Sequence, residues 1–200
     1  MSTFALEDNT IMLPYTEAIM NYCDKFTCGD RDLDEYFSED AFLYEKELLG
    51  KSFCWISKEN NKEIVAIITL SYDGIKTFTL DNSSRNKIQR KIPNKKRHRS
   101  YPAVLIGRLG VNSKYQGGGF RIGSQIVQIL KYWFVEENNK AACRFILVDA
   151  YNSDSTLRFY LKNEFNYLYQ TEEREMEAYG IDSSLHSRIL YYDLKLVEDK

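Results

Sequence analysis

The stretch from Ala103 to Phe120, AVLIGRLGVNSKYQGGGF, constrains the fold of this chain more than any other. Its first part is rich in β-branched residues and leucine, which favour a strand, and Pro102 stands just upstream, where a strand can begin. The chain then passes through three consecutive glycines. From Phe120 onward, apolar residues recur with the 3.6-residue period of a helix, which we place at about 120–137. The sequence therefore predicts a strand, a glycine-rich turn and a helix in immediate succession.

A glycine-rich turn at the start of a helix is suited to bind a phosphate. The first N–H groups of a helix have no intrahelical partners, and they stand at the positive end of its dipole. Glycines let an anion approach the backbone closely and adopt positive φ at little cost. This turn lacks a GxGxxG pattern, and no lysine follows the glycines as in a P-loop, which argues against the common nucleotide-binding motifs. On the glycines alone, a flexible linker is an equally good interpretation.

The residues around the glycines narrow the choice. RLGV, QGGG and IGS occur in this order before an amphipathic helix. This arrangement resembles motif A of the GNAT superfamily of acetyl-CoA-dependent N-acetyltransferases, whose pattern is Gln/Arg-x-x-Gly-x-Gly/Ala. Gln116 and Gly119 match its first two positions. The third position falls on Arg121, or on Gly123 if Phe120 and Arg121 are an insertion.

A second segment carries the same resemblance. FILVDAYNSDSTLRFYLKNEF, from Phe145 to Phe165, is similar to the family's strand, helix and FYxKxGF ending, with Glu164 where a glycine is usual. The two segments follow one another in the family's order and spacing. The resemblance implies an α/β (α+β) GNAT fold: a single mixed, twisted sheet of six to seven strands with helices on both faces. It also implies one N-acetyltransferase domain over residues 1–200.

The resemblance further implies which residues bind acetyl-CoA. The backbone of the central strand would pair with the pantetheine arm at Leu109, Gly110 and Val111. The turn and the first helical residues would hold the pyrophosphate, and these are Gln116, Gly117, Gly118, Gly119, Ile122, Gly123 and Ser124. Asn152 would reach the pantetheine amide, although capping the next helix is a competing role.

Tyr160 is the expected catalytic residue, because it stands at the tyrosine of the family's FY pair. A phenol with an ordinary pKa of about 10 is protonated at neutral pH, so it can donate a proton to a departing thiolate. Apart from the motif nothing distinguishes it, since the chain has 15 tyrosines. No residue stands out as a general base or as a metal ligand.

The segment FTCGDRDLDEYF, Phe26 to Phe37, allows two interpretations. In structural terms, Asp30 or Asp32 caps a helix that runs to about Leu49. Its apolar face would include Leu33, Phe37, Phe42 and Leu48. Phe-x-Cys-Gly followed by Leu-x-x-Tyr/Phe-Phe also resembles the N-terminal signature of a GNAT branch that includes toxins of toxin–antitoxin pairs. We expect Cys28 to be a packed residue and not a nucleophile, because no histidine is near it in sequence.

The rest of the chain completes an alternation of strands and helices. We expect an edge strand that starts at Phe4–Leu6 and a short helix between Pro14 and Lys25. Strands are predicted at Lys51–Ile56 and Glu63–Ser71, with a turn at Asp73–Gly74. The C-terminal part predicts a strand at Arg144–Val148, a helix from Asn152 or Ser153 to about Asn163, a strand at Phe165–Gln170, a loop or short helix at Glu172–Glu177 and a closing strand at Ile189–Val197.

The charge of the chain is unevenly distributed. The formal net charge is only −2, yet residues 82–135 contain 12 Lys or Arg and no Asp or Glu. We interpret residues 82–100 as a basic loop inserted before the central strand, and a solvated surface loop is the simpler interpretation. The functional interpretation is that this loop docks an acidic acceptor. Its substrate-binding candidates are Lys95, Lys96, Arg97 and Arg99, with Arg108 nearer the reacting centre.

Several classes of protein fit the composition poorly. The chain has 200 residues, 44% of them apolar, which suits one globular domain. No apolar run approaches the roughly 20 residues needed to span a bilayer, and the first residues do not look like a signal peptide. Four dispersed cysteines and two histidines argue against a disulfide framework or a zinc site. We therefore expect a cytoplasmic protein that binds no membrane and no metal.

The sequence thus predicts an acetyl-CoA-dependent N-acetyltransferase. A site without an evident base suits an amine of low pKa, and an α-amine, with a pKa of about 7.7–8.0, is roughly a tenth neutral at pH 7. The α-amine of an aminoacyl-tRNA is one such acceptor. A small-molecule amine, a protein amine and a non-catalytic acetyl-CoA-binding module are the alternatives. A small antitoxin partner and a homodimer are further expectations.

Overall fold

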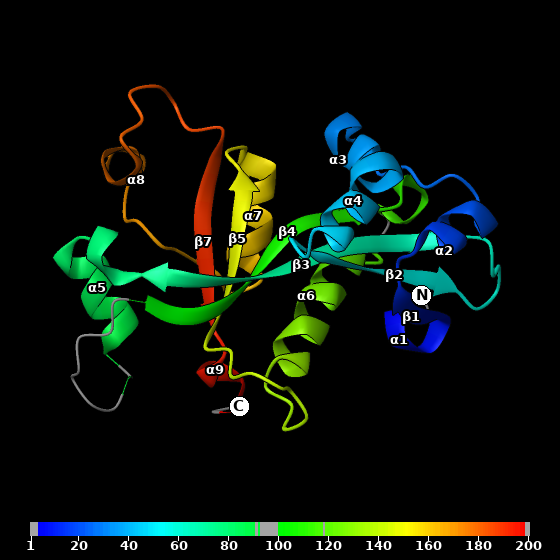
Figure 1. The fold of residues 1–200 in the computed structure, drawn as a ribbon, viewed down its shortest axis with the longest axis horizontal. Helices are drawn as coiled ribbons and strands as arrows, with labels where there is room; N and C mark the ends of the chain where they lie inside the picture. The colour runs from blue at the N-terminus through cyan, green and yellow to red at the C-terminus, as the bar shows by residue number, and fades with distance from the viewer. Residues whose placement is uncertain (1–3, 91, 93–99, 118, 199–200) are drawn as a thin grey trace. The chain divides into compact units, whose positions relative to one another are not determined.

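The computed structural model describes residues 4–90, 92, 100–117 and 119–198. The predicted site residues Lys95, Lys96, Arg97, Arg99 and Gly118 lie outside this part of the chain. Within it, seven strands form one mixed sheet in the order β1-β2-β3-β4-β5-β7-β6 (Figure 1). The strands are β1 (Thr10–Pro14), β2 (Lys51–Ser57), β3 (Ile64–Lys76), β4 (Ser100–Val111), β5 (Phe145–Tyr151), β6 (Asn166–Tyr167) and β7 (Ser187–Asp193).

Helices connect most of these strands. In chain order they are α1 (Leu6–Asn9), α2 (Glu17–Tyr22), α3 (Arg31–Glu35), α4 (Ala41–Lys46), α5 (Asn82–Gln89), α6 (Ile122–Trp133), α7 (Asp154–Lys162), α8 (Glu172–Tyr179) and α9 (Lys195–Glu198). A π-helical turn at Tyr36–Asp40 joins α3 to α4, and short 3₁₀ turns lie at Thr77–Thr79 and Ser113–Tyr115. No helix in the described ranges is both long and apolar enough to cross a membrane.

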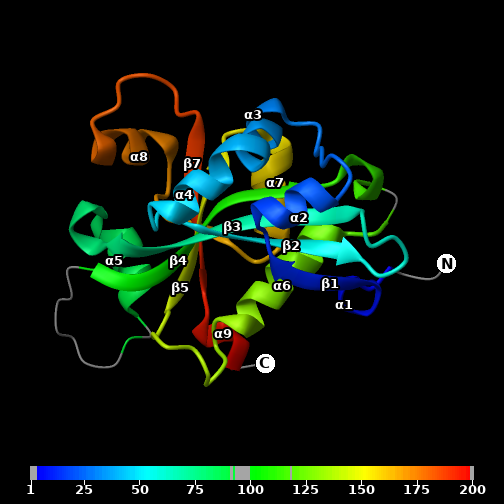
Figure 2. The same ribbon diagram turned by 45° about the vertical axis from the view of Figure 1, so that its right-hand side comes forward.

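The chain divides into two compact units, and the first comprises Met1–Ser71 and Ile106–Leu130. In it β1 pairs with β2, and β2 with β3, both antiparallel. The helical segment from α2 to α4 runs across β2 and β3 (Figures 1 and 2). It packs there through a cluster of buried aromatic and aliphatic residues: Tyr15, Phe26, Cys28, Tyr36, Phe37, Ala41, Phe42, Cys54, Ile56, Ile64 and Ile67. The side chain of Asp30 accepts a hydrogen bond from the N–H of Leu33, so Asp30 is the cap of α3.

The second unit comprises Tyr72–Leu105 and Lys131–Lys200. Strands β5 and β7 pair antiparallel along their whole length, from Phe145 opposite Asp193 to Tyr151 opposite Ser187. Helix α7 packs against β5 (Figure 1). Helix α8 is fixed to β7 by a buried ion pair, in which Arg188 Nε donates to Glu175 Oε2 at 2.6 Å.

Two local predictions near the N-terminus and in β3 were wrong, and tertiary contacts explain both. Leu6 begins α1 and not a strand, because its N–H donates to the side chain of Gln125 at 2.7 Å; the strand starts only at Thr10. Gly74 is not in a turn, since β3 continues to Lys76. A Cβ at Gly74 would lie 2.6 Å from Ser100 Oγ, so this glycine permits a close approach of neighbouring backbone.

Other boundaries also differ from the prediction. Helix α4 ends at Lys46, and Leu48, expected on its apolar face, is 90% exposed with φ of 58°. Strand β6 is only two residues long, and β7 ends at Asp193, after which the chain turns into α9.

The predicted loop at 82–100 begins with a helix. The side chain of Asp81 accepts hydrogen bonds from the N–H groups of Ser83 and Ser84, which caps α5. Arg85 donates to the carbonyls of Thr77 and Leu80, and Ile88 is buried. A strong cap and a single apolar anchor thus suffice for eight helical residues in a segment whose composition is that of a loop.

Candidate functional site

The glycine turn before α6 is described at two of its three glycines. Gly117 and Gly119 have φ of 68° and 86°, in the left-handed region that only glycine adopts at low cost. A Cβ built on either residue would meet no atom within 4 Å, so the space above the turn is open. Helix α6 begins three residues after Gly119, at Ile122. The turn therefore lies directly before a helix N-terminus, where the first N–H groups have no intrahelical partners.

The side chain of Gln116 holds this turn in place. Its Nε2 donates to the carbonyl oxygens of Cys28 and Val111, each at 2.7 Å. The N–H of Ser113 donates to the carbonyl of Thr27 at 3.0 Å. The Phe26–Phe37 motif, which the sequence offered as a separate signature, thus supports the glycine turn directly.

The backbone at Arg121 bears on the register of the glycine motif. Arg121 has φ of 53°, a conformation unusual for a residue with a side chain. Gly123 lies inside α6, where a helix needs no glycine. This favours the ungapped alignment, in which Arg121 occupies the third position of the motif with a glycine-like backbone.

The central strand presents two kinds of residue at the predicted pantetheine contact. Leu109 and Val111 are partly exposed. Gly110 is buried, and a Cβ there would lie 2.9 Å from the ring of Phe37 and 3.2 Å from that of Phe26. The absence of a side chain at Gly110 is therefore explained by aromatic packing, and its backbone is the part left for a cofactor contact.

Arg108 lies on β4, next to the motif of α3. Its guanidinium carbon stands 5.1 Å from the centre of the Tyr36 ring, and Nη1 donates to the carbonyl of Gly107 at 2.8 Å. Its Nε is buried and has no hydrogen-bond partner among the described residues. Burial raises the pKa of Tyr36, and the Arg108 charge partly opposes this rise.

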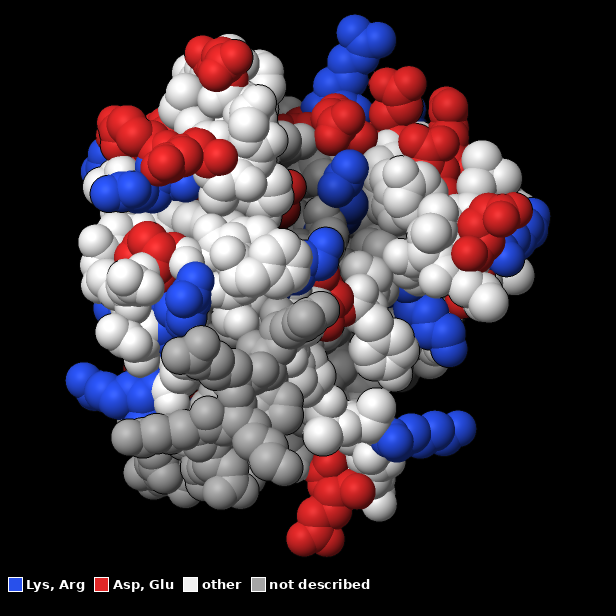
Figure 3. Space-filling model, turned by 60° about the vertical axis from the view of Figure 1, so that its left-hand side comes forward, with Lys and Arg blue, Asp and Glu red and all other residues white. Residues whose placement is uncertain are grey.

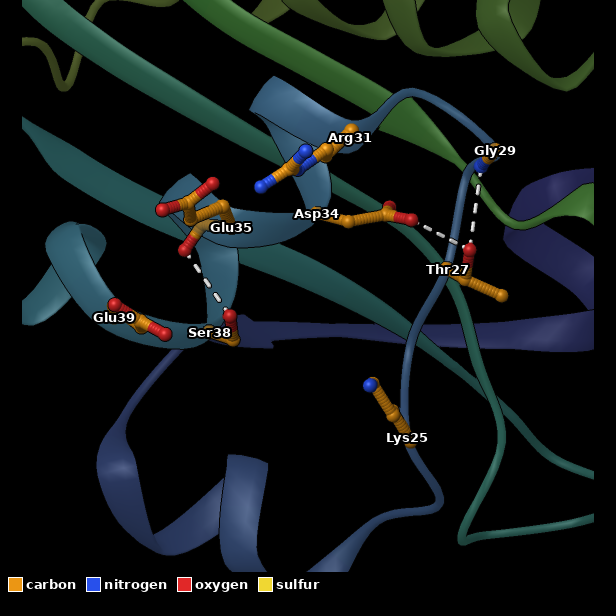
Figure 4. Close-up of a pocket in the computed structure, with 8 residues that line it drawn as sticks. All are labelled: Lys25, Thr27, Gly29, Arg31, Asp34, Glu35, Ser38 and Glu39. Carbon is orange, nitrogen blue, oxygen red and sulfur yellow. Dashed lines mark hydrogen bonds between the residues drawn. The ribbon is translucent and has the colours of Figure 1, made fainter.

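An open pocket of about 730 Å³ is lined by residues between Lys25 and Glu39 (Figure 4). Charged side chains of both signs are among its lining residues, which are Lys25, Thr27, Gly29, Arg31, Asp34, Glu35, Ser38 and Glu39. Asp34 accepts hydrogen bonds from Thr27 Oγ1 at 2.6 Å and from the N–H of Cys28 at 2.7 Å. Burial acts to raise the pKa of Asp34, but these bonds outweigh it and the pKa is lowered. The sequence marked this segment as a motif and gave no sign of a pocket.

Tyr160 lies in the second unit, on α7. It is 5% exposed, and its ring packs edge-on against Phe159 and Phe165. No described residue forms a hydrogen bond with its hydroxyl, and burial raises its pKa. Tyr160 is thus a protonated phenol, and its O–H group donates no hydrogen bond to the described part of the fold.

Asn152, in the same unit, does not cap α7. That role belongs to Ser153, whose Oγ accepts from the N–H of Thr156. The amide nitrogen of Asn152 instead donates to Glu172 Oε1 and to the carbonyl of Leu185. The side-chain amide of Asn152 thus joins the start of α7 to α8 and the segment before β7.

The four cysteines are all free. Cys28 and Cys54 are buried, and burial raises the pKa of each thiol to about 12. Burial also raises the pKa of Cys23 and Cys143. The expectation that Cys28 is a packed residue is confirmed.

The structure thus places the predicted residues in two groups. Arg108, the strand residues and the glycine turn belong to the first unit, whereas Asn152 and Tyr160 belong to the second. On the face drawn in Figure 3, acidic and basic side chains of the described residues are interspersed. The basic cluster at 95–99 lies outside the described residues.

Comparison with solved structures identifies the fold. AtaT complexed with acetyl-methionyl-tRNAfMet has a TM-score of 0.65 and 15% identity over 95% of this chain and 98% of that chain. A KacT variant with one tyrosine replaced by phenylalanine has a TM-score of 0.64 and 17% identity over 96% and 98%. AtaTR bound with AcCoA has a TM-score of 0.61 and 14% identity over 96% and 97%.

Comparisons at the level of sequence add nothing, since no protein-family model and no curated protein matches the chain. At 14–17% identity the likeness is one of fold. It extends over nearly the full length of each partner in the comparison. The chain therefore has the GNAT fold predicted from its glycine motif, in the form seen in AtaT and KacT.

Proposed function

We propose that this protein is an acetyl-CoA-dependent N-acetyltransferase. The observation that carries the proposal is the open glycine turn, with Gly117 and Gly119 at positive φ between β4 and α6. A backbone of this kind suits the pyrophosphate of CoA. The fold shared with AtaTR bound with AcCoA supports the same cofactor.

In this proposal the first unit binds the cofactor. The backbone of Leu109, Gly110 and Val111 pairs with the pantetheine arm as an added strand would. The N–H groups from Gly117 to Ser124 hold the pyrophosphate, with Gln116 anchoring the turn to Cys28 and Val111. Acetyl-CoA supplies the acetyl group as an activated thioester.

Tyr160 is the proposed general acid. Transfer forms a C–N bond and breaks the C–S bond, so the sulfur leaves with the electron pair and needs a proton. A thiol has a pKa of roughly 8.5. Burial raises the pKa of Tyr160, which keeps the phenol protonated at neutral pH but makes it a weaker donor, so its role is to donate to the sulfur as negative charge develops there. Asn152 contributes indirectly, by fixing the start of α7, the helix that carries Tyr160.

The α-amine of an aminoacyl-tRNA is the acceptor we favour. AtaT, which shares the fold, was solved with acetyl-methionyl-tRNAfMet. The basic residues Lys95, Lys96, Arg97 and Arg99 supply charges suited to phosphates. A small-molecule or protein amine is the alternative acceptor, and acetyl-CoA binding without transfer is the alternative function.

Incubation with acetyl-CoA and a panel of amines and charged tRNAs tests this proposal, with the acetylated product identified by mass spectrometry. Replacing the four basic residues by serine should weaken tRNA binding and flatten its salt dependence, while acetyl-CoA affinity stays the same. If the unmodified protein does not bind tRNA, a small-molecule or protein amine becomes the favoured acceptor. Saturable acetyl-CoA binding with no product on any acceptor would favour the non-catalytic function.

We also propose an antitoxin partner. AtaT was solved bound to the C-terminus of the antitoxin AtaR, and KacTA was solved with DNA. A small DNA-binding protein encoded beside this chain should co-purify with it, and failure of such a neighbour to bind would remove this part of the proposal. Sedimentation of the isolated protein would test the expected homodimer.

A further inference from the structure

Arg108 has a positive charge that the described part of the chain does not neutralise. Its Nε is buried without a hydrogen-bond partner, and no described carboxylate lies within ion-pair distance of its guanidinium. A buried polar group that gives up water without gaining a partner destabilises the fold. An arrangement of this kind calls for an acceptor that arrives from outside the chain.

A second arginine shows what neutralisation looks like in this protein. The Nε of Arg144 is likewise buried without a partner, but its Nη2 donates to Asp193 Oδ2 at 2.8 Å. Arg144 therefore has its counter-ion within the fold, and a structural role accounts for it. No described carboxylate pairs with the guanidinium of Arg108 in this way.

The surroundings of Arg108 hold its guanidinium in one place. It stacks on Tyr36, which is itself fixed by a hydrogen bond with Thr69. Thr69 Oγ1 is in turn 2.8 Å from Ser52 Oγ. The charge of Asp40 raises the pKa of Tyr36, yet Asp40 forms no ion pair with Arg108 within the described residues. A rigid donor without a counter-ion is preorganised to bind an oxygen.

We propose that Arg108 binds the acyl oxygen beside the reacting amine, and so selects α-aminoacyl acceptors. This rests on the proposed acetyltransferase function. Arg108 directly precedes the strand residues to which we assign the pantetheine arm. A simple alkylamine offers no oxygen to a guanidinium, whereas an amino acid, an amino-acid ester and an aminoacyl-tRNA all do. Their α-amines also have the lower pKa that a site without a base requires.

The test compares Arg108→Met and Arg108→Lys with Arg144→Met as the matched control. The acceptors are a set of amino-acid methyl esters, the free amino acids, charged tRNA, and propargylamine as an amine without an acyl oxygen. We expect Arg108→Met to lower kcat/KM for the α-aminoacyl acceptors about 10- to 100-fold, mainly through KM. Arg108→Lys should restore only part of this loss. Acetyl-CoA affinity and the rate with propargylamine should not change.

Stability separates this role from a structural one. Without its ligand, the Arg108→Met protein should unfold at the same or a higher temperature than the unmodified protein, because it loses a buried Nε group that has no hydrogen-bond partner. Arg144→Met should unfold at a lower temperature, because Asp193 loses its partner. Lower stability in Arg108→Met, an equal loss with propargylamine, or weaker acetyl-CoA binding would each overturn the proposal.

A failure of the proposed function would be visible separately. If the unmodified protein acetylates no amine, the enzymatic proposal fails, and Arg108 is then judged by binding of the product analogue N-acetylalanine methyl ester. Thermal stabilisation of the unmodified protein, but not of Arg108→Met, would support an acyl-oxygen site. No stabilisation of either protein would overturn it. The free acids, the esters and charged tRNA together identify which source of the acyl oxygen the site takes.

Discussion

Lys131 Nζ donates a hydrogen bond to Glu164 Oε2 at 3.0 Å, in a turn where Glu164 has φ of 68°. Lys131 is 1% exposed and also donates to the carbonyl of Asn163 at 2.8 Å. Its ammonium stands 3.9 Å from the centre of the Tyr192 ring. The GNAT pattern has a glycine at the position of Glu164, so the ion pair compensates for a side chain in a glycine conformation. This turn closes the helix that carries Tyr160, because the N–H groups of Asn163 and Phe165 donate to the Tyr160 carbonyl.

Lys131 and Glu164 should therefore respond very differently to substitution. Lys131→Met removes a buried cation and leaves polar partners behind, and should cost about 2–4 kcal/mol of unfolding free energy. Glu164→Gly leaves the buried Lys131 ammonium without its carboxylate but relieves about 1–2 kcal/mol of left-handed strain, so it should cost about 1–2 kcal/mol less than Lys131→Met. Urea denaturation of both variants measures this. Equal destabilisation by the two changes would mean that strain at Glu164 is small.

The glycine turn predicts a loss of cofactor binding without a loss of fold. Gly117→Asp and Gly119→Asp place a negative side chain where we propose the pyrophosphate, so acetyl-CoA binding should be abolished. Gly180→Asp is the matched control, because Gly180 also has positive φ, 65°, and open space around a Cβ. All three should lose similar stability. Calorimetric titration with acetyl-CoA reads the difference, and unchanged affinity in a folded Gly119→Asp protein would remove the pyrophosphate assignment.

Tyr160→Phe separates chemistry from binding. The change keeps the ring and its contacts with Phe159 and Phe165 but deletes the hydroxyl. Acetyl-CoA affinity should persist while kcat falls about 10²- to 10⁴-fold, the usual effect of losing a general acid. Tyr132→Phe is a control on an exposed tyrosine, 59% accessible, and should have no effect. Near-normal turnover in Tyr160→Phe would show that another group protonates the thiolate or that it leaves unprotonated.

Asp34 predicts an acid-sensitive component of stability. Because its pKa is lowered in the folded protein, the ionised carboxylate favours folding at pH values above its unfolded pKa of about 3.9. This contribution is lost as the pH falls through the lower, folded pKa. Thermal unfolding between about pH 2 and pH 6 should show a steeper loss in the unmodified protein than in Asp34→Asn. Parallel curves for the two proteins would contradict a lowered pKa.

The sequence predicted those parts of the fold that depend on near neighbours. The strand, turn and helix around Gly119 follow from local periodicity, and residue type limited the cap of α3 to Asp30 or Asp32, of which Asp30 is the cap. Gly74 and Leu6 were assigned wrongly, because each is governed by a residue distant in the chain, Ser100 and Gln125.

The same limit applies to the candidate site. The hydrogen bonds of Gln116 join residues 88 positions apart, and no local pattern encodes them. The Nε of Arg108 has no partner because no suitable acceptor among the described residues comes near it in space. Only the three-dimensional arrangement can show this. The left-handed backbone at Arg121 and Glu164 was also not predictable, because residues with side chains seldom adopt it.

The cysteines have a practical consequence for the assay of this protein. Free CoA is a reactive thiol at about pH 8, and a chromogenic aryl disulfide would report its release continuously. Cys28 and Cys54, with pKa values near 12, would be thiolate in only about one molecule in ten thousand at that pH. Cys23 and Cys143 are also shifted away from the thiolate. The protein should therefore consume the reagent slowly, and the colour that develops should count acetyl transfers.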